Sequence, residues 1–463
     1  MAKPKLNKLT FSGFWLALIL FVPVTFRAQN DTLTVFENLA QGKISGYWRN
    51  YYMATDNEGN LTDWNALATG GLLKYQAKVY QNISLDIGFY FNSALAGNYQ
   101  MFDTTTLKRS RYESGLFDLE DLSKREFALL GELFLQYSYK KHTIKIGRYK
   151  MKSPLINPED GRMIPTLEQG VWYRFKTNKK WTFQLFGISR ISPRGTSRFM
   201  PVQESFGIYP VGKTIYGTNA QYKRNTSSYG IAVLNINYSR NKFNHKIWNY
   251  YVENVFNTLF YEGNFSFNKK EKIKHSVAWQ FIYQNKINNG GNPDTLKRYF
   301  NQNNSKIAGL QYKVSINKTT FSVNGNYIFN DGRFLFPREW GREFLFVFQK
   351  RERLEGVSNT LAWMVQAKHK FVLAKKRILT AALGYGQYYR PDAKTFRSNK
   401  YAMPANDQLN LDLIYMAHPN KKGMNIELLI TRKNALGNTY NNPNFILNKV
   451  NMTVFNLIMN YRF

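Results

Sequence analysis

Hydrophobic and polar residues alternate one by one along much of this chain, which is the period of a β-strand with two different faces. Residues 310–316 read L-Q-Y-K-V-S-I, and a turn at 317–319 leads into a return strand with the same alternation. A second hairpin joins residues 409–415 to residues 424–430. Similar segments recur at residues 83–91, 133–139, 181–187, 277–283 and 361–367. The pattern predicts an all-β protein built from repeated antiparallel hairpins.

The connections between these strands alternate between short turns and long polar stretches. Residues 139–142 and 317–319 are short turns. The long stretches occupy residues 94–125, 285–306, 331–359 and 390–407. Short turns at the periplasmic rim and long loops outside are typical of single-chain transmembrane barrels. At about 24 residues for each strand and its share of loop, we expect about 18 strands, with 16 as the alternative.

The first 28 residues read as a secretory signal. Lys3, Lys5 and Lys8 precede an apolar run over residues 14–26, which is too short for a bilayer that needs roughly 20 residues. We expect a signal peptide at residues 1–28, a short N-terminal segment at 29–42 and the barrel at 43–463; a short membrane anchor is the alternative for the first segment. Beyond residue 28 no apolar run reaches the length of a helical span, and a closed barrel is the other structure that satisfies its own backbone in lipid.

Charge and composition then limit the function. The 64 Lys and Arg residues against 30 Asp and Glu give a net charge of +34, which favours an anionic partner. For an exported protein we expect lipopolysaccharide, outer-membrane lipid or small anionic solutes as partners, and no nucleic acid. The chain has no cysteine, and its five histidines lack metal-site spacing, so we predict no metal. Without a glycine-rich phosphate loop or a serine-nucleophile motif, we predict no cofactor and no enzyme activity.

The C-terminal strand ends on an aromatic residue. Phe463, Tyr461 and Met459 share one face, opposite Arg462 and Asn460. A terminal aromatic on an amphipathic strand resembles the signal read by the outer-membrane barrel-assembly machinery. The alternative is an ordinary edge strand. The first interpretation places the protein in the outer membrane of a Gram-negative bacterium.

One stretch, residues 132–170, resembles the OprD-type outer-membrane porins. In that family a strand ending in G-R leads into a D-x-R-x-x-P-x-x-x-x-G segment, and residues 189–194 and 197–199 are similar to the arginine-containing loop that follows. The matching positions here are Gly147, Arg148, Asp160, Arg162, Pro165 and Gly170. The resemblance implies an 18-stranded barrel whose inward-folded loops narrow the pore, with passive diffusion past a ladder of basic side chains that faces carboxylate-bearing solutes.

Two sets of residues are candidates for this function. The candidate pore constriction is Asp160, Arg162, Arg190 and Arg194. The candidate basic ladder consists of residues on the polar faces of strands: Lys74, Lys78, Lys145, Arg174, Lys176, Lys313 and Lys368. Cationic side chains lining a pore lower the barrier for anions. As alternatives, Asp160 and Arg162 form an ion pair that only holds a loop, and the lysines only solvate the lumen or rim.

A second charged stretch, residues 337–353, is compatible with an inward-folding loop or a solvated external one, and we expect the external loop. The sequence as a whole predicts a passive outer-membrane porin for small hydrophilic solutes that favours anionic or carboxylate-bearing ones. The alternative is an outer-membrane barrel that binds or exports an acidic polysaccharide.

Overall fold

The computed structural model describes residues 35–98, 101–158, 162–177, 180–270, 272–418 and 422–463. The expected signal peptide at residues 1–28 therefore lies outside the described residues. Within the described residues, no helix is both long enough and apolar enough to cross a membrane.

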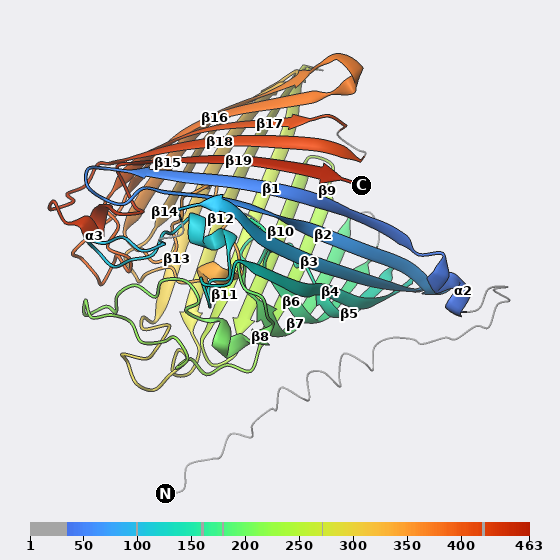
Figure 1. Ribbon diagram of the computed structural model, residues 1–463, viewed down its shortest axis with the longest axis horizontal. Helices are drawn as coiled ribbons and strands as arrows, with labels where there is room; N and C mark the ends of the chain where they lie inside the picture. The colour runs from blue at the N-terminus through green and yellow to red at the C-terminus, as the bar shows by residue number, and fades with distance from the viewer. Residues whose placement is uncertain (1–34, 99–100, 159–161, 178–179, 271, 419–421) are drawn as a thin grey trace, which may run out of the picture.

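The described residues form a closed antiparallel barrel (Figure 1). Each long strand pairs with its neighbours along the chain, and β1 pairs with β19 to close the ring. Eighteen of the strands described make up the wall, since β8 is a two-residue strand inside a loop, and the predicted number is confirmed. The wall strands are β1 (Lys43–Asn57), β2 (Trp64–Tyr80), β3 (Ile83–Gly97), β4 (Glu126–Tyr139), β5 (His142–Tyr149), β6 (Leu167–Lys176), β7 (Trp181–Ser192), β9 (Ile231–Arg240), β10 (Phe243–Val252), β11 (Phe256–Lys270), β12 (Ile273–Lys286), β13 (Asn304–Ile316), β14 (Thr319–Ile328), β15 (Thr360–Val372), β16 (Ile378–Tyr389), β17 (Asn406–Met416), β18 (Gly423–Ala435) and β19 (Met452–Arg462).

The alternation in sequence becomes two faces of the wall. On β13, Leu310 and Tyr312 are exposed on the outside, whereas Gln311 between them is buried on the inside. The exposed large side chains of the other strands follow the same parity, for example Leu133 and Leu135 on β4. An apolar outer face and a polar inner face are what a barrel needs in order to cross a bilayer.

The two ends of the barrel differ. One end has tight hairpins such as β4–β5 and β13–β14, and we name it the short-turn end. The opposite end has long connections such as β3–β4 and β7–β9, and we name it the long-loop end. Figure 1 shows the loops gathered at one end of the strands, together with helix α3 (Pro443–Ile446). The four long stretches predicted from sequence are confirmed within a few residues. Shorter elements in the loops are β8 (Met200–Pro201), η1 (Glu113–Leu116), η2 (Val202–Ser205) and η3 (Arg338–Trp340), while η4 (Ala374–Lys376) lies in a hairpin at the short-turn end.

The loop between β14 and β15 folds into the barrel. Gln284 of β12 donates a hydrogen bond to the carbonyl of Leu335 (2.7 Å), and Arg351 donates one to Asn456 of β19 (2.6 Å). The loop therefore touches inner-wall residues of strands that lie far apart in the sheet order. Its apolar side chains join the largest buried cluster, with Trp340 completely buried. The expectation of a solvated external loop at 337–353 is wrong.

The two ends of the described chain meet the wall at the short-turn end. Helix α2 (Val35–Ala40) lies against β2, where the Tyr75 hydroxyl donates a hydrogen bond to the carbonyl of Leu39. At closure, the backbone groups of Phe463 and Gly46 exchange two hydrogen bonds of 3.2 Å. Any β-carbon on Gly46 would overlap the carbonyl of Leu72 in the neighbouring strand, so this close approach requires glycine.

Candidate functional site

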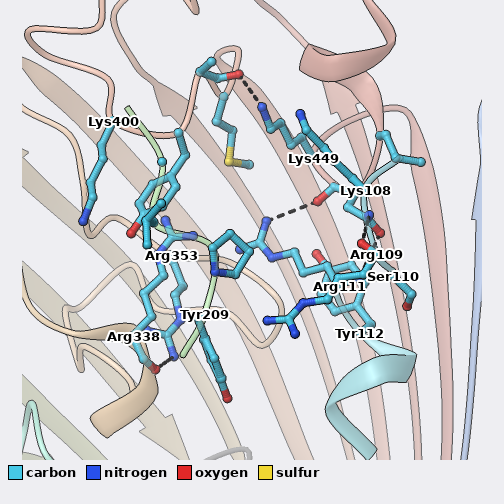
Figure 2. Close-up of a pocket in the computed structure, with 18 of the residues that line it drawn as sticks. Lys108, Arg109, Ser110, Arg111, Tyr112, Tyr209, Arg338, Arg353, Lys400 and Lys449 are labelled. Carbon is cyan, nitrogen blue, oxygen red and sulfur yellow. Dashed lines mark hydrogen bonds between the residues drawn. The ribbon is translucent and has the colours of Figure 1, made fainter. Parts of the chain in front are cut away.

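A cavity of about 830 Å³ lies among the loops of the long-loop end (Figure 2). Six connections supply its lining: β3–β4, β5–β6, β7–β9, β14–β15, β16–β17 and β18–β19. Because these segments are far apart in sequence, the cavity exists only once the barrel has closed and its loops have folded together.

The lining is strongly cationic. Among its described residues there are twelve lysines and arginines and no aspartate or glutamate. In Figure 2 the cations of the β3–β4 and β18–β19 loops face those of the β14–β15 and β16–β17 loops across the cavity. We name this the basic cavity, and its cations are Lys108, Arg109, Arg111, Arg162, Arg194, Lys213, Arg338, Arg342, Arg351, Arg353, Lys400 and Lys449.

Neutral carbonyl groups hold the two arginines that the β3–β4 loop contributes to the cavity. Arg109 donates to the carbonyls of Leu119 (3.2 Å) and Ile208 (3.0 Å). Arg111 donates to the carbonyl of Asn448 (3.2 Å). A carbonyl fixes the direction of a guanidinium without cancelling its charge, so both side chains add positive potential to the cavity.

Lys449 is held in the same way. Its ammonium group donates to the carbonyls of Asn444 (2.7 Å) and Ala402 (2.9 Å). Burial lowers the pKa of Lys449 well below its usual value, and neighbouring cations lower it further. Those neighbours are Lys108, Arg111, Arg338 and Lys213. Repulsion between cations is therefore built into the cavity.

On the side of the cavity formed by the β14–β15 and β16–β17 loops, buried carboxylates pair with the cations. Glu355 pairs with Arg338 (2.7 Å) and Lys400 (3.6 Å), and Glu343 pairs with Arg353 (3.4 Å). Burial opposes the ionisation of Glu355, but Lys400 and Arg338 outweigh it and hold the pKa of this carboxyl below its usual value. These acids are absent from the cavity lining, so they anchor the cations from behind.

The β14–β15 loop is fixed to the wall by a further buried carboxylate. Glu352 accepts hydrogen bonds from Arg390 (2.6 Å) and from Lys433 of β18 (2.8 Å), and all three side chains are at most 2% exposed. Burial would raise the pKa of Glu352, but these two cations lower it to about 2. Nearby, Lys350 bridges Asp412 and Glu427 on the inner wall.

A second cavity, of about 490 Å³, lies inside the barrel on another side of the same loop. Its lining combines Phe344 and Phe348 of the loop with polar side chains of β10–β15, including Lys313. There Lys246 pairs with Glu262 at 3.3 Å. The β14–β15 loop thus contributes to the lining of both cavities.

The strand register places the seven residues of the predicted ladder on the inner face. They are Lys74, Lys78, Lys145, Arg174, Lys176, Lys313 and Lys368. Their surroundings differ. Lys74 pairs with Asp86 (2.9 Å) and Glu132 (3.1 Å), so its charge is balanced. Lys145 lies over the ring of Phe134, 4.4 Å from the centroid; it forms no ion pair among the described residues, although Asp86 and Glu132 are near enough to attract its charge.

The predicted constriction is only partly brought together. Arg162 and Arg194 line the basic cavity, whereas Asp160 lies outside the described residues. Arg194 donates to the Tyr209 hydroxyl (2.6 Å). The Arg162 guanidinium occupies space beside Gly115 that a β-carbon there would fill.

Arg190 does not join them. The β6–β7 ladder shifts register between Gln169 and Gly170, because one extra residue of β7 is bulged out. Beyond this bulge Ile191 is buried and Arg190 is exposed. The bulge therefore turns Arg190 away from the cavity, and its inclusion in the constriction is corrected.

Most of the basic cavity was missed from sequence, because its cations lie in stretches that read as polar or solvated loops. Two local signals were present: residues 108–112 read K-R-S-R-Y, and the charged stretch 337–353 supplies four of the twelve cations. The partners across the cavity, such as Lys400 and Lys449, carry no such local signal. In the described part of the chain, no three His, Cys, Asp or Glu side chains are grouped so as to hold a metal ion.

Comparison with known proteins places the fold. No family model and no curated protein sequence matches the chain. Among solved structures, the outer membrane protein OpdK of Pseudomonas aeruginosa has a TM-score of 0.69 at 15% identity, over 92% of this chain and 99% of that one. OccAB2 of Acinetobacter baumannii has a TM-score of 0.69 at 12% identity, with 92% and 98% covered. OccK9 (OpdG) of Pseudomonas aeruginosa has a TM-score of 0.69 at 12% identity, over 92% of this chain and 99% of that one. At these identities the likeness establishes a shared fold.

Proposed function

From the fold that this chain shares with the OprD-type outer-membrane porins, we propose that it is a passive porin of a Gram-negative outer membrane. In this proposal small hydrophilic solutes cross the barrel past the β14–β15 loop, and anions are favoured. The basic cavity carries the proposal: a solute arriving from the long-loop end meets twelve cations, four of them on the β14–β15 loop itself.

The physical basis of the preference is the local potential. Cations that converge on a narrow, partly dehydrated passage attract anions and repel cations, and interactions there are screened less than in bulk water. The inner-face lysines toward the short-turn end, Lys145 among them, extend the same potential into the lumen. One of the similar structures, OpdK, was solved with vanillate, an organic anion, which supports an anionic solute here.

The test is single-channel recording in a planar bilayer across a tenfold KCl gradient. We expect steady conductance and a reversal potential that favours anions. Arg162→Ala, which removes one cation of the cavity, shifts the reversal potential toward zero. Lys318→Ala removes the same charge from an exposed turn at the short-turn end and leaves the reversal potential unchanged.

Two results contradict parts of the proposal. A folded barrel that carries no current excludes the porin and favours the polysaccharide-binding alternative. Conductance without anion preference keeps the porin and removes the proposed role of the cavity.

A further inference from the structure

The basic cavity has more positive charge than a single negative charge could balance. Its cations come from loops on opposite sides, and the described acids that pair with Arg338, Lys400 and Arg353 lie behind them. A monovalent anion that approaches one side leaves the cations of the other side repelling one another. A ligand with two or more negative charges can meet both sides at once.

The donors in the cavity also suit oxyanions. A guanidinium presents a planar fork of N–H groups that matches carboxylate and phosphate oxygens, and an ammonium group adds a compact point charge. Arg109 and Arg111 each use one or two of their N–H groups on carbonyls, and a guanidinium has five. The volume of about 830 Å³ is within the range of small-molecule sites, roughly 300–1,000 Å³.

We propose that the basic cavity is a binding site for a multivalent oxyanion, a small solute whose two or more negative charges are carried on phosphate or carboxylate groups. The proposal rests on the porin function and specifies its substrate class: multivalent oxyanions are retained in the cavity during passage, and monovalent anions pass without being retained. The lowered pKa of Lys449 supports this, because the cation repulsion that contributes to it is what a multivalent anion relieves.

The test compares three anions at equal ionic strength: pyrophosphate, citrate and acetate. Each is added at the long-loop side of single channels in about 0.1 M KCl, where the Debye length is about 10 Å. We expect pyrophosphate or citrate to interrupt the current at concentrations at least about tenfold below those of acetate, and we expect this advantage to shrink in 1 M KCl. If only one of the two is effective, the result identifies phosphate or carboxylate as the group recognised.

Variants locate the site. In Arg111→Gln/Lys449→Gln the amides can still donate hydrogen bonds, but two positive charges are lost, so block by the multivalent anions weakens about tenfold. The charge-conserving pair Arg111→Lys/Lys449→Arg retains the block. Lys272→Gln/Lys318→Gln removes the same charge from exposed turns at the short-turn end and also retains it.

Titration calorimetry of the detergent-solubilised barrel with the same anions separates this proposal from the porin function. Binding of pyrophosphate or citrate to a barrel that carries no current keeps the site and excludes the porin. A conducting channel on which neither anion acts more strongly than acetate overturns the site and leaves the porin standing. If the multivalent anions block Arg111→Gln/Lys449→Gln as strongly as the wild type, the binding site is not in the basic cavity.

Discussion

At the scale of single residues, Lys400 shows how the folded loops set the charge of the basic cavity. Burial, reinforced by Arg333 and Arg338 and opposed by Glu355, lowers the pKa of Lys400 to about 8. Three aromatic rings lie about 5 Å from its ammonium group, those of Tyr222, Tyr299 and Tyr401. A lysine that usually stays charged far above neutral pH therefore titrates close to it.

This titration predicts a pH-dependent selectivity. Between pH 7 and pH 9, Lys400 loses its proton and the cavity loses one positive charge, so the anion-to-cation permeability ratio falls. One charge about 10 Å from the permeating ion in water changes the energy of an anion and of a cation by about 0.4 kcal/mol each, in opposite directions, so the ratio changes about fourfold. Reversal potentials measured at a series of pH values check this.

Lys400→Gln provides the comparison, because it removes the group that titrates. The ratio in this variant is low already at pH 7 and does not fall near pH 8. Lys318→Gln, in an exposed turn, behaves like the wild type. If the permeability ratio of Lys400→Gln falls by the same factor between pH 7 and pH 9, another group is responsible for the titration.

At the scale of elements, the β14–β15 loop depends on one buried anchor. Glu352 is held by Arg390 and Lys433, and the loop it fixes touches both cavities. Removing one partner of a buried ion pair leaves the other charges uncompensated and costs about 3–5 kcal/mol. We therefore expect Glu352→Gln to destabilise the barrel by that amount at pH 7, measured by denaturant unfolding in detergent.

The pH dependence of unfolding gives an independent check on Glu352. Its pKa is about 2 in the folded protein, and an unfolded glutamate titrates near about 4.3. Because the pKa of Glu352 is lower in the folded protein, its contribution to the free energy of unfolding is complete above the pKa of the unfolded state. This contribution is lost as the pH falls from about 4.3 toward 2. The Gln variant lacks this contribution, so its stability falls less than that of the wild type over the same range.

Glu120→Gln serves as the matched control. Glu120 pairs with Arg198 (2.8 Å), but the two side chains are 27% and 50% exposed. Such a pair contributes at most about 1 kcal/mol, so this variant should remain close to the wild type. Equal losses in both variants would refute the special role of Glu352.

The strands were predictable because their signal is local. Alternation over a few residues fixes which side of the wall a residue faces, and β13 and β14 follow it without interruption. Arg190 was assigned to the constriction from the resemblance of residues 189–194 to an arginine-containing loop, and that resemblance does not reveal the one-residue bulge that turns Arg190 outward.

The inward fold of the β14–β15 loop was not predictable from its own residues. A stretch rich in Arg and Glu reads as solvated, and it becomes buried only because its charges find partners elsewhere, as Glu352 does with Arg390 and Lys433. These partners are 38 and 81 positions away in sequence. The basic cavity was missed for the same reason, since it is assembled from six connections.

At the scale of the whole molecule, the barrel is closed by its first and last strands. β1 and β19 pair in register from Tyr47 and Arg462 to Asn57 and Met452, and Phe463 continues the pairing to Gly46. The wall therefore cannot be complete until both ends of the barrel are present. Any signal that starts assembly from the C-terminal strand would control formation of the pore.

The exposed aromatic at that end gives the last prediction. Phe463 and Tyr461 lie on the outer face, where an assembly machinery can reach them before lipid covers the wall. We expect Phe463→Ala to lower, severalfold, the amount of folded barrel in the outer membrane of a Gram-negative host. Refolding of the denatured protein into detergent needs no machinery, so its yield stays at the wild-type level. Phe455 is a similarly exposed ring on the same strand, and we expect Phe455→Ala to assemble normally. If both variants lose a comparable amount of folded barrel in cells, or if Phe463→Ala loses refolding yield, Phe463 acts through barrel stability and not through recognition.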